Sequence, residues 1–187
     1  MKAIHYILTA CLLTVAICNS SAQVNPRDAK KQNCEKFKDS KIKKDTKFAV
    51  FAAEAGMKEV QYSKLAETNA MATPVKNLGK AMVEDHSAAG SELQSIASTK
   101  GIILPGVICK SAQKDYQKLS DKRGKDFDKA YTKCMVHDHK KAVKCFQKEA
   151  DHGNDPELKA WAAQKLPTLR HHLEMAKDAC KVAKDEQ

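Results

Sequence analysis

The sequence has few aromatic residues and only one long apolar run, and both shortages narrow the range of folds. Phenylalanine, tyrosine and tryptophan make up 5% of its 187 residues, and tryptophan occurs once. After the N-terminal run, no segment reaches the roughly 20 apolar residues that a membrane-spanning helix needs. No segment shows the strand pattern of alternating apolar and polar residues either. We therefore expect an all-α protein with closely packed helices and no transmembrane segment in the mature chain.

Familiar catalytic and nucleic-acid motifs are also missing. The chain contains no nucleophile with a partnered base and no glycine-rich loop of the kind that cradles phosphate. It carries no motif of a nucleic-acid-binding module, so no nucleic-acid partner is expected. The sequence alone assigns neither a catalytic residue nor an oligomeric state.

Residues 1–22 have the features of a secretory signal peptide. A positive charge near the start precedes an apolar run over residues 7–17, and residues 20–22 are small, as signal peptidase requires. We expect cleavage directly after this stretch and export of the mature chain. The alternative is a lipoprotein anchored through Cys18, although Ile17 stands where a small residue normally precedes the lipidated cysteine.

Five cysteines follow the signal peptide, in a chain whose export would favour pairing of thiols. Because five is an odd number, at least one cysteine stays free or pairs outside the chain. Cys134 and Cys145 share one predicted helix, and at 1.5 Å per residue they lie about 16 Å apart, too far for a disulfide. We therefore expect any bridge among the three that lie close to helix ends: Cys34, Cys109 and Cys180.

The formal charge of +10 is concentrated near the start of the mature chain. Residues 27–47 contain eight lysines and one arginine against four acids, with Phe37 as the only aromatic residue. We interpret residues 23–44 as a basic flexible leader that precedes a helical domain over residues 45–187. Such a leader is either solvated without a partner or in contact with an anionic surface of the cell envelope.

Four long segments repeat apolar residues every three or four positions, which is the spacing of one helical face. Two of them begin with a capping residue followed by proline, at residues 73–74 and 155–156. Pro167 should kink or break the last helix. Two helical hairpins joined by a longer link predict a four-helix bundle. The expected helices span residues 46–70, 73–101, 125–151 and 155–184, with a shorter one over 112–119 in the crossover between the hairpins.

The string Met-Val-x-Asp-His occurs twice, at residues 82–86 and 135–139, near the middle of two predicted helices. The repeat suggests that two hairpins arose from one. On a helical wheel, the Asp and the His of each copy flank the apolar stripe, whereas His137 and His171 point outward. Counting residues from the turns places the inward-facing groups near mid-height of the bundle. These groups form one predicted polar layer: Glu59, Asp85, His86, Asp138, His139 and His172.

Such a layer is chemically suited to a divalent transition metal such as iron, zinc, manganese or copper. Carboxylate oxygens and neutral imidazole nitrogens, presented by several rigid helices, are the ligands these ions take. The aspartates can instead accept hydrogen bonds from the imidazoles and fix their tautomers. The alternative function is a metal-free structural or interaction module of the envelope, in which aspartate and histidine satisfy each other's buried polar groups.

Five stretches of the chain carry a family resemblance: residues 48–60, 82–86, 127–131, 135–139 and 166–176. In this order they resemble a large bacterial family of exported proteins of unknown function, often labelled as outer-membrane or periplasmic proteins. The resemblance covers about residues 45–178 and implies a ferritin-like four-helix bundle in the periplasm. It implies no reaction, and we expect a role in metal handling or envelope stress protection. Ferritin-like di-iron proteins use Glu-x-x-His on two helices, whereas this chain has adjacent Asp and His.

Overall fold

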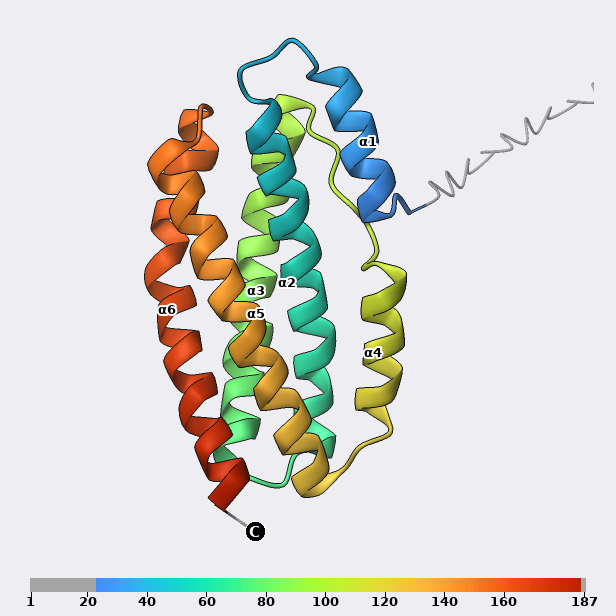
Figure 1. Ribbon diagram of the computed structural model, residues 1–187, viewed down its shortest axis with the longest axis vertical. Coiled ribbons are helices and arrows are strands. Elements are labelled where there is room, and N and C mark those ends of the chain that lie inside the picture. The colour runs from blue at the N-terminus through green and yellow to red at the C-terminus, as the bar shows by residue number, and fades with distance from the viewer. Residues whose placement is uncertain (1–22, 186–187) are drawn as a thin grey trace, which may run out of the picture.

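The computed structural model describes residues 23–185, and this part of the chain consists of six helices and their connections, without a strand. The predicted all-α class is confirmed, whereas the expected signal peptide lies outside the described residues. No helix within residues 23–185 is long and apolar enough to cross a membrane. The helices are α1 (Pro26–Lys36), α2 (Lys43–Asn69), α3 (Thr73–Lys100), α4 (Lys110–Ser120), α5 (Gly124–His152) and α6 (Pro156–Asp185) (Figure 1).

The four long helices form a bundle of two antiparallel hairpins, α2–α3 and α5–α6. Across the hairpins, α2 packs against α5 and α3 packs against α6, so α3 and α5 occupy opposite corners. Both of these helices run upward in Figure 1, whereas α2 and α6 run downward. The bounds of all four lie within three residues of those predicted from the apolar spacing.

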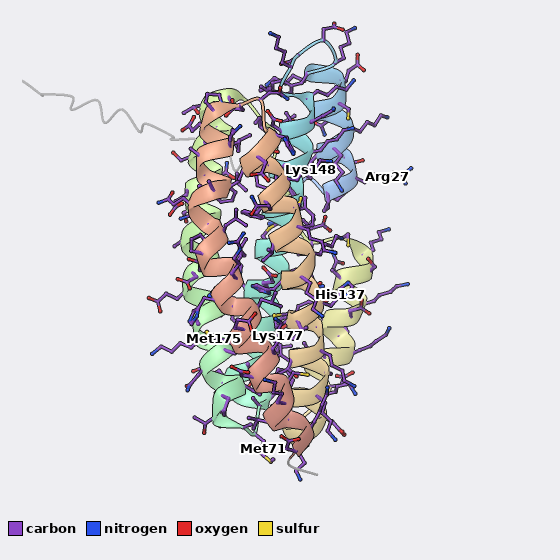
Figure 2. All side chains as sticks on the ribbon, turned by 60° about the vertical axis from the view of Figure 1, so that its left-hand side comes forward. Arg27, Met71, His137, Lys148, Met175 and Lys177 are labelled. Atoms are coloured by element: carbon purple, nitrogen blue, oxygen red, sulfur yellow. The ribbon has the colours of Figure 1, made fainter. Side chains whose placement is uncertain are left out.

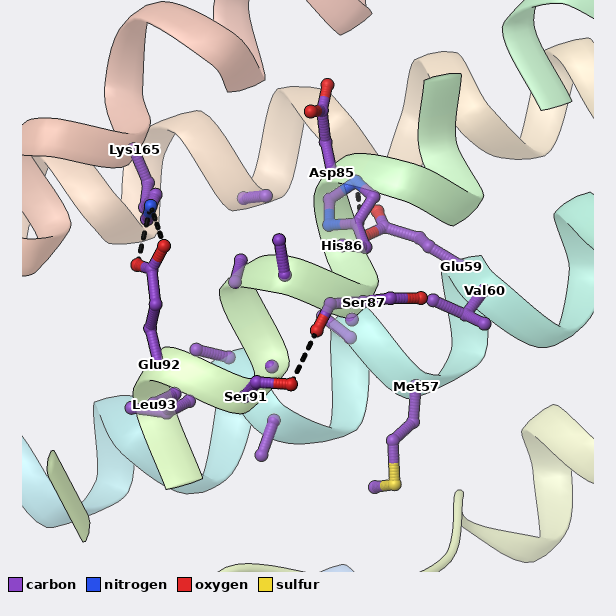
Figure 3. A pocket seen from close by; sticks show the side chains of 18 of the residues that line it. Met57, Glu59, Val60, Asp85, His86, Ser87, Ser91, Glu92, Leu93 and Lys165 are labelled. Atoms are coloured by element: carbon purple, nitrogen blue, oxygen red, sulfur yellow. Dashed lines mark hydrogen bonds and ion pairs between the residues drawn. The ribbon is translucent and has the colours of Figure 1, made fainter. Parts of the chain in front are cut away.

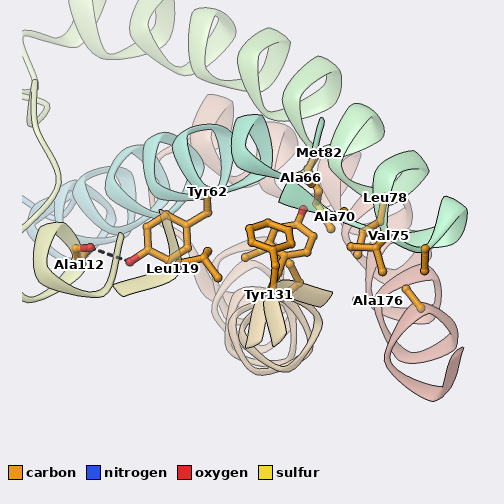
Figure 4. Packing of buried hydrophobic residues seen from close by; sticks show 14 of the residues in the cluster. Tyr62, Ala66, Ala70, Val75, Leu78, Met82, Ala112, Leu119, Tyr131 and Ala176 are labelled. Atoms are coloured by element: carbon orange, nitrogen blue, oxygen red, sulfur yellow. Dashed lines mark hydrogen bonds between the residues drawn. The ribbon is translucent and has the colours of Figure 1, made fainter. Parts of the chain in front are cut away.

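A long crossover makes α3 and α5 parallel. It begins at Gly101, which ends α3 with a left-handed φ of 64° that favours glycine. It then passes along the bundle to the start of α5 and includes the predicted short helix, α4. The hydroxyl of Tyr62 on α2 donates a 2.7 Å hydrogen bond to the carbonyl of Ala112, which fixes α4 against the bundle (Figure 4).

A buried aspartate of each hairpin holds the turn of the other hairpin. The carboxylate of Asp128, near the start of α5, accepts backbone N–H bonds from Met71 at 3.2 Å and from Ala72 at 2.8 Å. Asp45, in the first turn of α2, accepts bonds of 2.9 and 2.6 Å from the backbone of residues 154 and 155. These bonds satisfy N–H groups that a helix start leaves without a partner. The two hairpins are therefore fastened together at both ends.

The apolar core has two parts, one toward each end of the bundle. The part near the α2–α3 turn includes Leu78, Met82 and Tyr131, all fully buried (Figure 4). The part near the α5–α6 turn is centred on Phe48 and Trp161, whose rings meet edge to face at 6.1 Å. The polar layer described below lies between the two parts, because helix α3 passes from Met82 through His86 to Leu93.

Part of the expected flexible leader is instead an ordered helix, α1, which packs against α2. Asn25 caps it by accepting a 3.0 Å bond from the backbone N–H of Asp28, and Pro26 follows at the first helical position. The side chain of Asn33, 1% exposed, forms two hydrogen bonds with the backbone of Ile103, at 2.7 and 2.9 Å. A net basic charge therefore did not prevent this segment from folding onto the domain, because polar pairing of Asn33 adds to the burial of Pro26 and Ala29.

Helix α6 continues through Pro167, so of the two expected effects of this proline the break does not occur. The five cysteines of the described chain all have free thiols, so the bridge expected among Cys34, Cys109 and Cys180 does not form.

Replacing Asp128 with alanine should lower the free energy of unfolding by about 2–4 kcal/mol, because two backbone N–H groups at the α2–α3 turn lose a charged acceptor. Urea unfolding followed by circular dichroism measures the change. The matched control is Asp126→Ala, an exposed aspartate in the same helical turn, which should cost less than about 1 kcal/mol. Equal effects of the two substitutions would show that the buried carboxylate does not hold the turn.

Candidate metal site

One polar side chain from each long helix points into the middle of the bundle. Glu59 comes from α2, His86 from α3, His139 from α5 and His172 from α6, and none is more than 8% exposed. One ligand atom of each imidazole lies within 4.8 Å of those of the other two. The ring centroids are 5.3 to 5.5 Å apart. Three buried histidines at this spacing can hold a metal ion.

Glu59 lies between two of the histidines. Its Oε2 is 3.3 Å from Nε2 of His86, and its Oε1 is 3.4 Å from Nδ1 of His139. Figure 3 shows the carboxylate reaching from α2 toward the His86 ring on α3. Neither contact has the direction of a hydrogen bond, and Oε1 of Glu59 and Nε2 of His86 remain buried without a hydrogen-bond partner.

The other two imidazoles are oriented by hydrogen bonds on their outer nitrogens. Nδ1 of His139 lies 3.1 Å from the carbonyl of Met135, so this nitrogen must carry the proton and donate it. Nε2 of His172 likewise donates to Oδ2 of Asp85 at 2.8 Å. The remaining nitrogens, Nε2 of His139 and Nδ1 of His172, then carry lone pairs, and both are buried without a hydrogen-bond partner. Metal-binding histidines are typically held in this way by a carbonyl or carboxylate on the far nitrogen.

Burial sets the charge of these groups. It lowers the pKa of His86 to about 4, and it also lowers those of His139 and His172, helped by the neighbouring imidazoles. All three rings are therefore neutral near pH 7 and present lone pairs. Burial raises the pKa of Glu59 to about 7, although His139 and Lys58 oppose the shift. Glu59 therefore exchanges a proton near neutral pH, unlike an exposed glutamate.

The two aspartates of the repeated string lie outside this central group. Asp85 is exposed at the bundle surface and holds the outer nitrogen of His172. Asp138 faces α2 instead, where it accepts bonds from Lys58 at 2.7 Å and from the Cys134 thiol at 3.3 Å. Burial and Asp138 raise the pKa of Cys134 to about 12, so this thiol stays protonated. The structure thus brings four of the six predicted residues together and gives the aspartates other partners.

Lys58 is the partner that the sequence did not indicate. A helical wheel places Asp138 at the edge of the apolar stripe but does not say which neighbouring helix it meets. The only indication in the sequence of a basic partner was that Lys58 is adjacent to Glu59. Many exposed helices share this pattern of neighbouring opposite charges. His137 and His171 are exposed, as predicted, and His137 lies on the outer face of α5 (Figure 2).

The repeated string has an approximate twofold arrangement in space. His86 and His139 lie on the parallel, diagonally opposite helices α3 and α5, while Glu59 and His172 are each the seventeenth residue of their helices. A half-turn about the bundle axis therefore exchanges the two copies and places Glu59 opposite His172. Duplication of a hairpin would instead relate α2 to α5 and α3 to α6. The copies do not lie in that relation, so the repeat does not support the expected origin of two hairpins from one.

The comparisons with known proteins give a family but no activity. No curated protein and no solved structure is significantly similar to the chain. One family model, described as "Domain of unknown function (DUF4142)", matches residues 30–179, which extend from within α1 into α6. This match covers most of the chain and agrees with the predicted resemblance to a family of unknown function. The chain therefore belongs to the DUF4142 family.

Proposed function

We propose that the protein binds one divalent transition-metal ion at mid-height of the bundle, through His86, His139, His172 and Glu59. The observation that carries this proposal has two parts. One nitrogen of each of the three buried imidazoles lies within 4.8 Å of the others, and one nitrogen of each ring is buried without a hydrogen-bond partner. Buried polar atoms are nearly always paired in folded proteins, so three such nitrogens in one place require an explanation. A metal ion supplies the missing partner for all three.

The chemistry of the four side chains supports the same ion class. Neutral imidazoles suit zinc, copper and iron, and a carboxylate oxygen is accepted by all of these and by manganese. Asp85 and the Met135 carbonyl already hold the outer nitrogens of His172 and His139, as outer partners do in metal sites. A metal-free network would satisfy these outer nitrogens equally well, but it leaves the inner ones unpaired.

The topology supports the proposal of a ferritin-like bundle, because a single long crossover makes α3 and α5 parallel. The site differs from that of a di-iron protein, which uses four glutamates and two histidines. Here one glutamate and three histidines face the centre. That ligand number suits one ion, so we assign the protein to metal handling or stress protection in the envelope, not to di-iron oxidation.

Export remains part of the proposal, and it rests on the signal-like composition of residues 1–22. When the full chain is produced in a Gram-negative bacterium, we expect the protein in the periplasmic fraction with Gln23 as its first residue. Intact-mass spectrometry of the purified protein measures the cleavage point. A mature chain that begins at a lipidated Cys18 would establish the anchored alternative, and an uncleaved chain in the cytoplasm would contradict both.

The mature protein should take up about one equivalent of zinc, manganese, iron(II) or copper(II) after chelation. At a hundredfold excess over Kd, binding adds about 2.7 kcal/mol and raises the melting temperature by roughly 5–10 °C. His139→Ala and His172→Ala should abolish the uptake and the thermal shift, because each removes a central nitrogen. Elemental analysis and differential scanning calorimetry measure both effects.

The matched controls for this experiment are His137→Ala and His171→Ala, which remove exposed imidazoles from the same two helices. Both controls should bind metal as the wild type does. If none of the four ions is retained and none shifts the melting temperature, the metal site is refuted and the metal-free network takes its place.

Metal affinity should rise with pH through the titration of Glu59. Its pKa of about 7 means that a proton occupies most of the carboxyl at pH 6 and must leave before the metal binds, whereas at pH 8 the group is already ionised. Binding should therefore be about tenfold tighter at pH 8 than at pH 6. His86, whose pKa burial lowers to about 4, is neutral at both pH values and adds nothing to this slope. Burial also lowers the pKa values of His139 and His172, which reduces their share of it.

Isothermal titration calorimetry at the two pH values measures the affinity, and repeating it in buffers of different ionisation enthalpy counts the protons released. Glu59→Gln removes the titrating group and should bind more weakly with a flat pH dependence. If the glutamine variant keeps the tenfold slope of the wild type, Glu59 does not control the proton linkage.

A further inference from the structure

A cavity of about 910 Å³ opens beside the candidate metal site. Glu59, His86 and His172 line it and, being buried, form its inner end. Figure 3 shows Glu59 and His86 in this position. The walls come from all four long helices, with residues 104–105 of the crossover at one side. This volume is typical of pockets for small molecules. A metal ion coordinated by four side chains needs no such space, so the metal site alone does not explain the cavity.

The cavity exists because small residues line the gap between α2 and α3. Toward the α2–α3 turn the helices are in contact, since a Cβ added to Gly79 would lie 2.6 Å from Cβ of Ala66. On the other side of Glu59 and His86, the gap between α2 and α3 is wider. A Cβ added to Gly56 or Gly90 would meet nothing within 4 Å, and both glycines line the cavity. The neighbouring wall residues are mostly alanines: Ala52, Ala53, Ala55, Ala88 and Ala89.

The inner end of the cavity carries polar atoms that lack a partner. Oε1 of Glu59 and Nε2 of His86 belong to side chains that are 2% and 8% exposed, and neither atom has a hydrogen bond. Both residues line the cavity. Farther out, Glu92 is engaged, because it accepts bonds from Trp161 and from Lys165. Most other outer polar residues of the lining, including Lys64, are exposed to solvent. A molecule in the cavity would therefore meet buried polar atoms without partners at the inner end, small apolar residues along the α2–α3 gap and solvated polar side chains farther out.

We propose that this cavity binds a small monocarboxylate with a short apolar chain, whose carboxylate contacts the metal ion. The proposal rests on the proposed metal site and adds its ligand class. A divalent ion beside ionised Glu59 and three neutral imidazoles keeps one positive charge in a poorly solvated place, which attracts one anion. The apolar walls favour a hydrocarbon chain over a second charged group.

The charged groups nearby do not cancel this attraction. Lys58 and Asp138 form a pair with each other. The carboxylate of Asp85 is 48% exposed, and solvent screens its charge. Three histidines and one carboxylate also leave room for another ligand, since such sites can expand to five-coordinate.

The test uses the mature protein loaded with cobalt(II), whose visible absorption reports on its ligands. Titration with hexanoate should change this spectrum in the wild type, and azide, a small anion without a chain, should change it as well. Gly56→Leu and Gly90→Leu each place a side chain in the gap and should weaken hexanoate binding at least tenfold while azide still binds. Gly56→Ala gives a similar gain in helix propensity with little added volume, and it should behave as the wild type.

The possible results distinguish failure of the metal site from failure of the carboxylate proposal alone. If no cobalt spectrum appears before any anion is added, the metal site fails, and the carboxylate proposal fails with it. If cobalt binds but its spectrum ignores hexanoate, or if both leucine variants bind hexanoate as tightly as the wild type, the carboxylate proposal alone is overturned. Circular dichroism and cobalt stoichiometry establish that a variant is folded, and either leucine variant is sufficient for the test.

Discussion

The burial of Glu59 among three imidazoles is the interaction around which the bundle is organised. A carboxylate removed from water needs a proton, a positive charge or hydrogen-bond donors. Here the surrounding rings are themselves deprived of protons by burial, so they offer little positive charge. The carboxyl accordingly holds its proton up to about pH 7. The centre is short of positive charge, and a divalent cation satisfies the carboxylate and the ring nitrogens together.

Such a layer limits what the rest of the fold can do. It separates two apolar clusters, so neither cluster alone runs the length of the bundle. Hydrogen bonds at the two ends of the bundle add to the limited apolar contact, since Asp128 and Asp45 each accept backbone N–H bonds from the turn of the opposite hairpin. Pairs such as Lys58 with Asp138 and Asp85 with His172 add polar links between hairpins at mid-height. The relative position of the hairpins therefore depends on polar contacts at three levels.

The sequence predicted the helices and the inward residues well, because apolar spacing reports which face of a helix is buried. It placed Glu59, His86, His139 and His172 correctly near mid-height, since that needed only counts along each helix. The possibility that an aspartate holds an imidazole is confirmed for Asp85, which holds His172. The sequence did not predict which helix each aspartate meets, because a wheel angle at the edge of a stripe leaves two neighbouring helices available.

The ordered helix α1 was missed for a related reason. Besides burying Pro26 and Ala29, it is held by hydrogen bonds of Asn33 to a backbone segment 70 residues away in the sequence. Composition and charge carry no information about such a pairing. The same limit applies to the turn-holding aspartates, whose donors lie more than 50 residues away.

Helix α1 also contacts the crossover segment that forms one side of the cavity. Asn33 forms hydrogen bonds with the backbone of Ile103, and Lys36 donates one to the carbonyl of Gly101. The residues after Ile103, Leu104 and Pro105, form part of the cavity wall. The backbone N–H of Gly106 is bonded in turn to the carbonyl of Val24. One side of the cavity is therefore held in place by residues 24–36, so substitutions in α1 should alter the cavity wall although they lie far from it in the sequence.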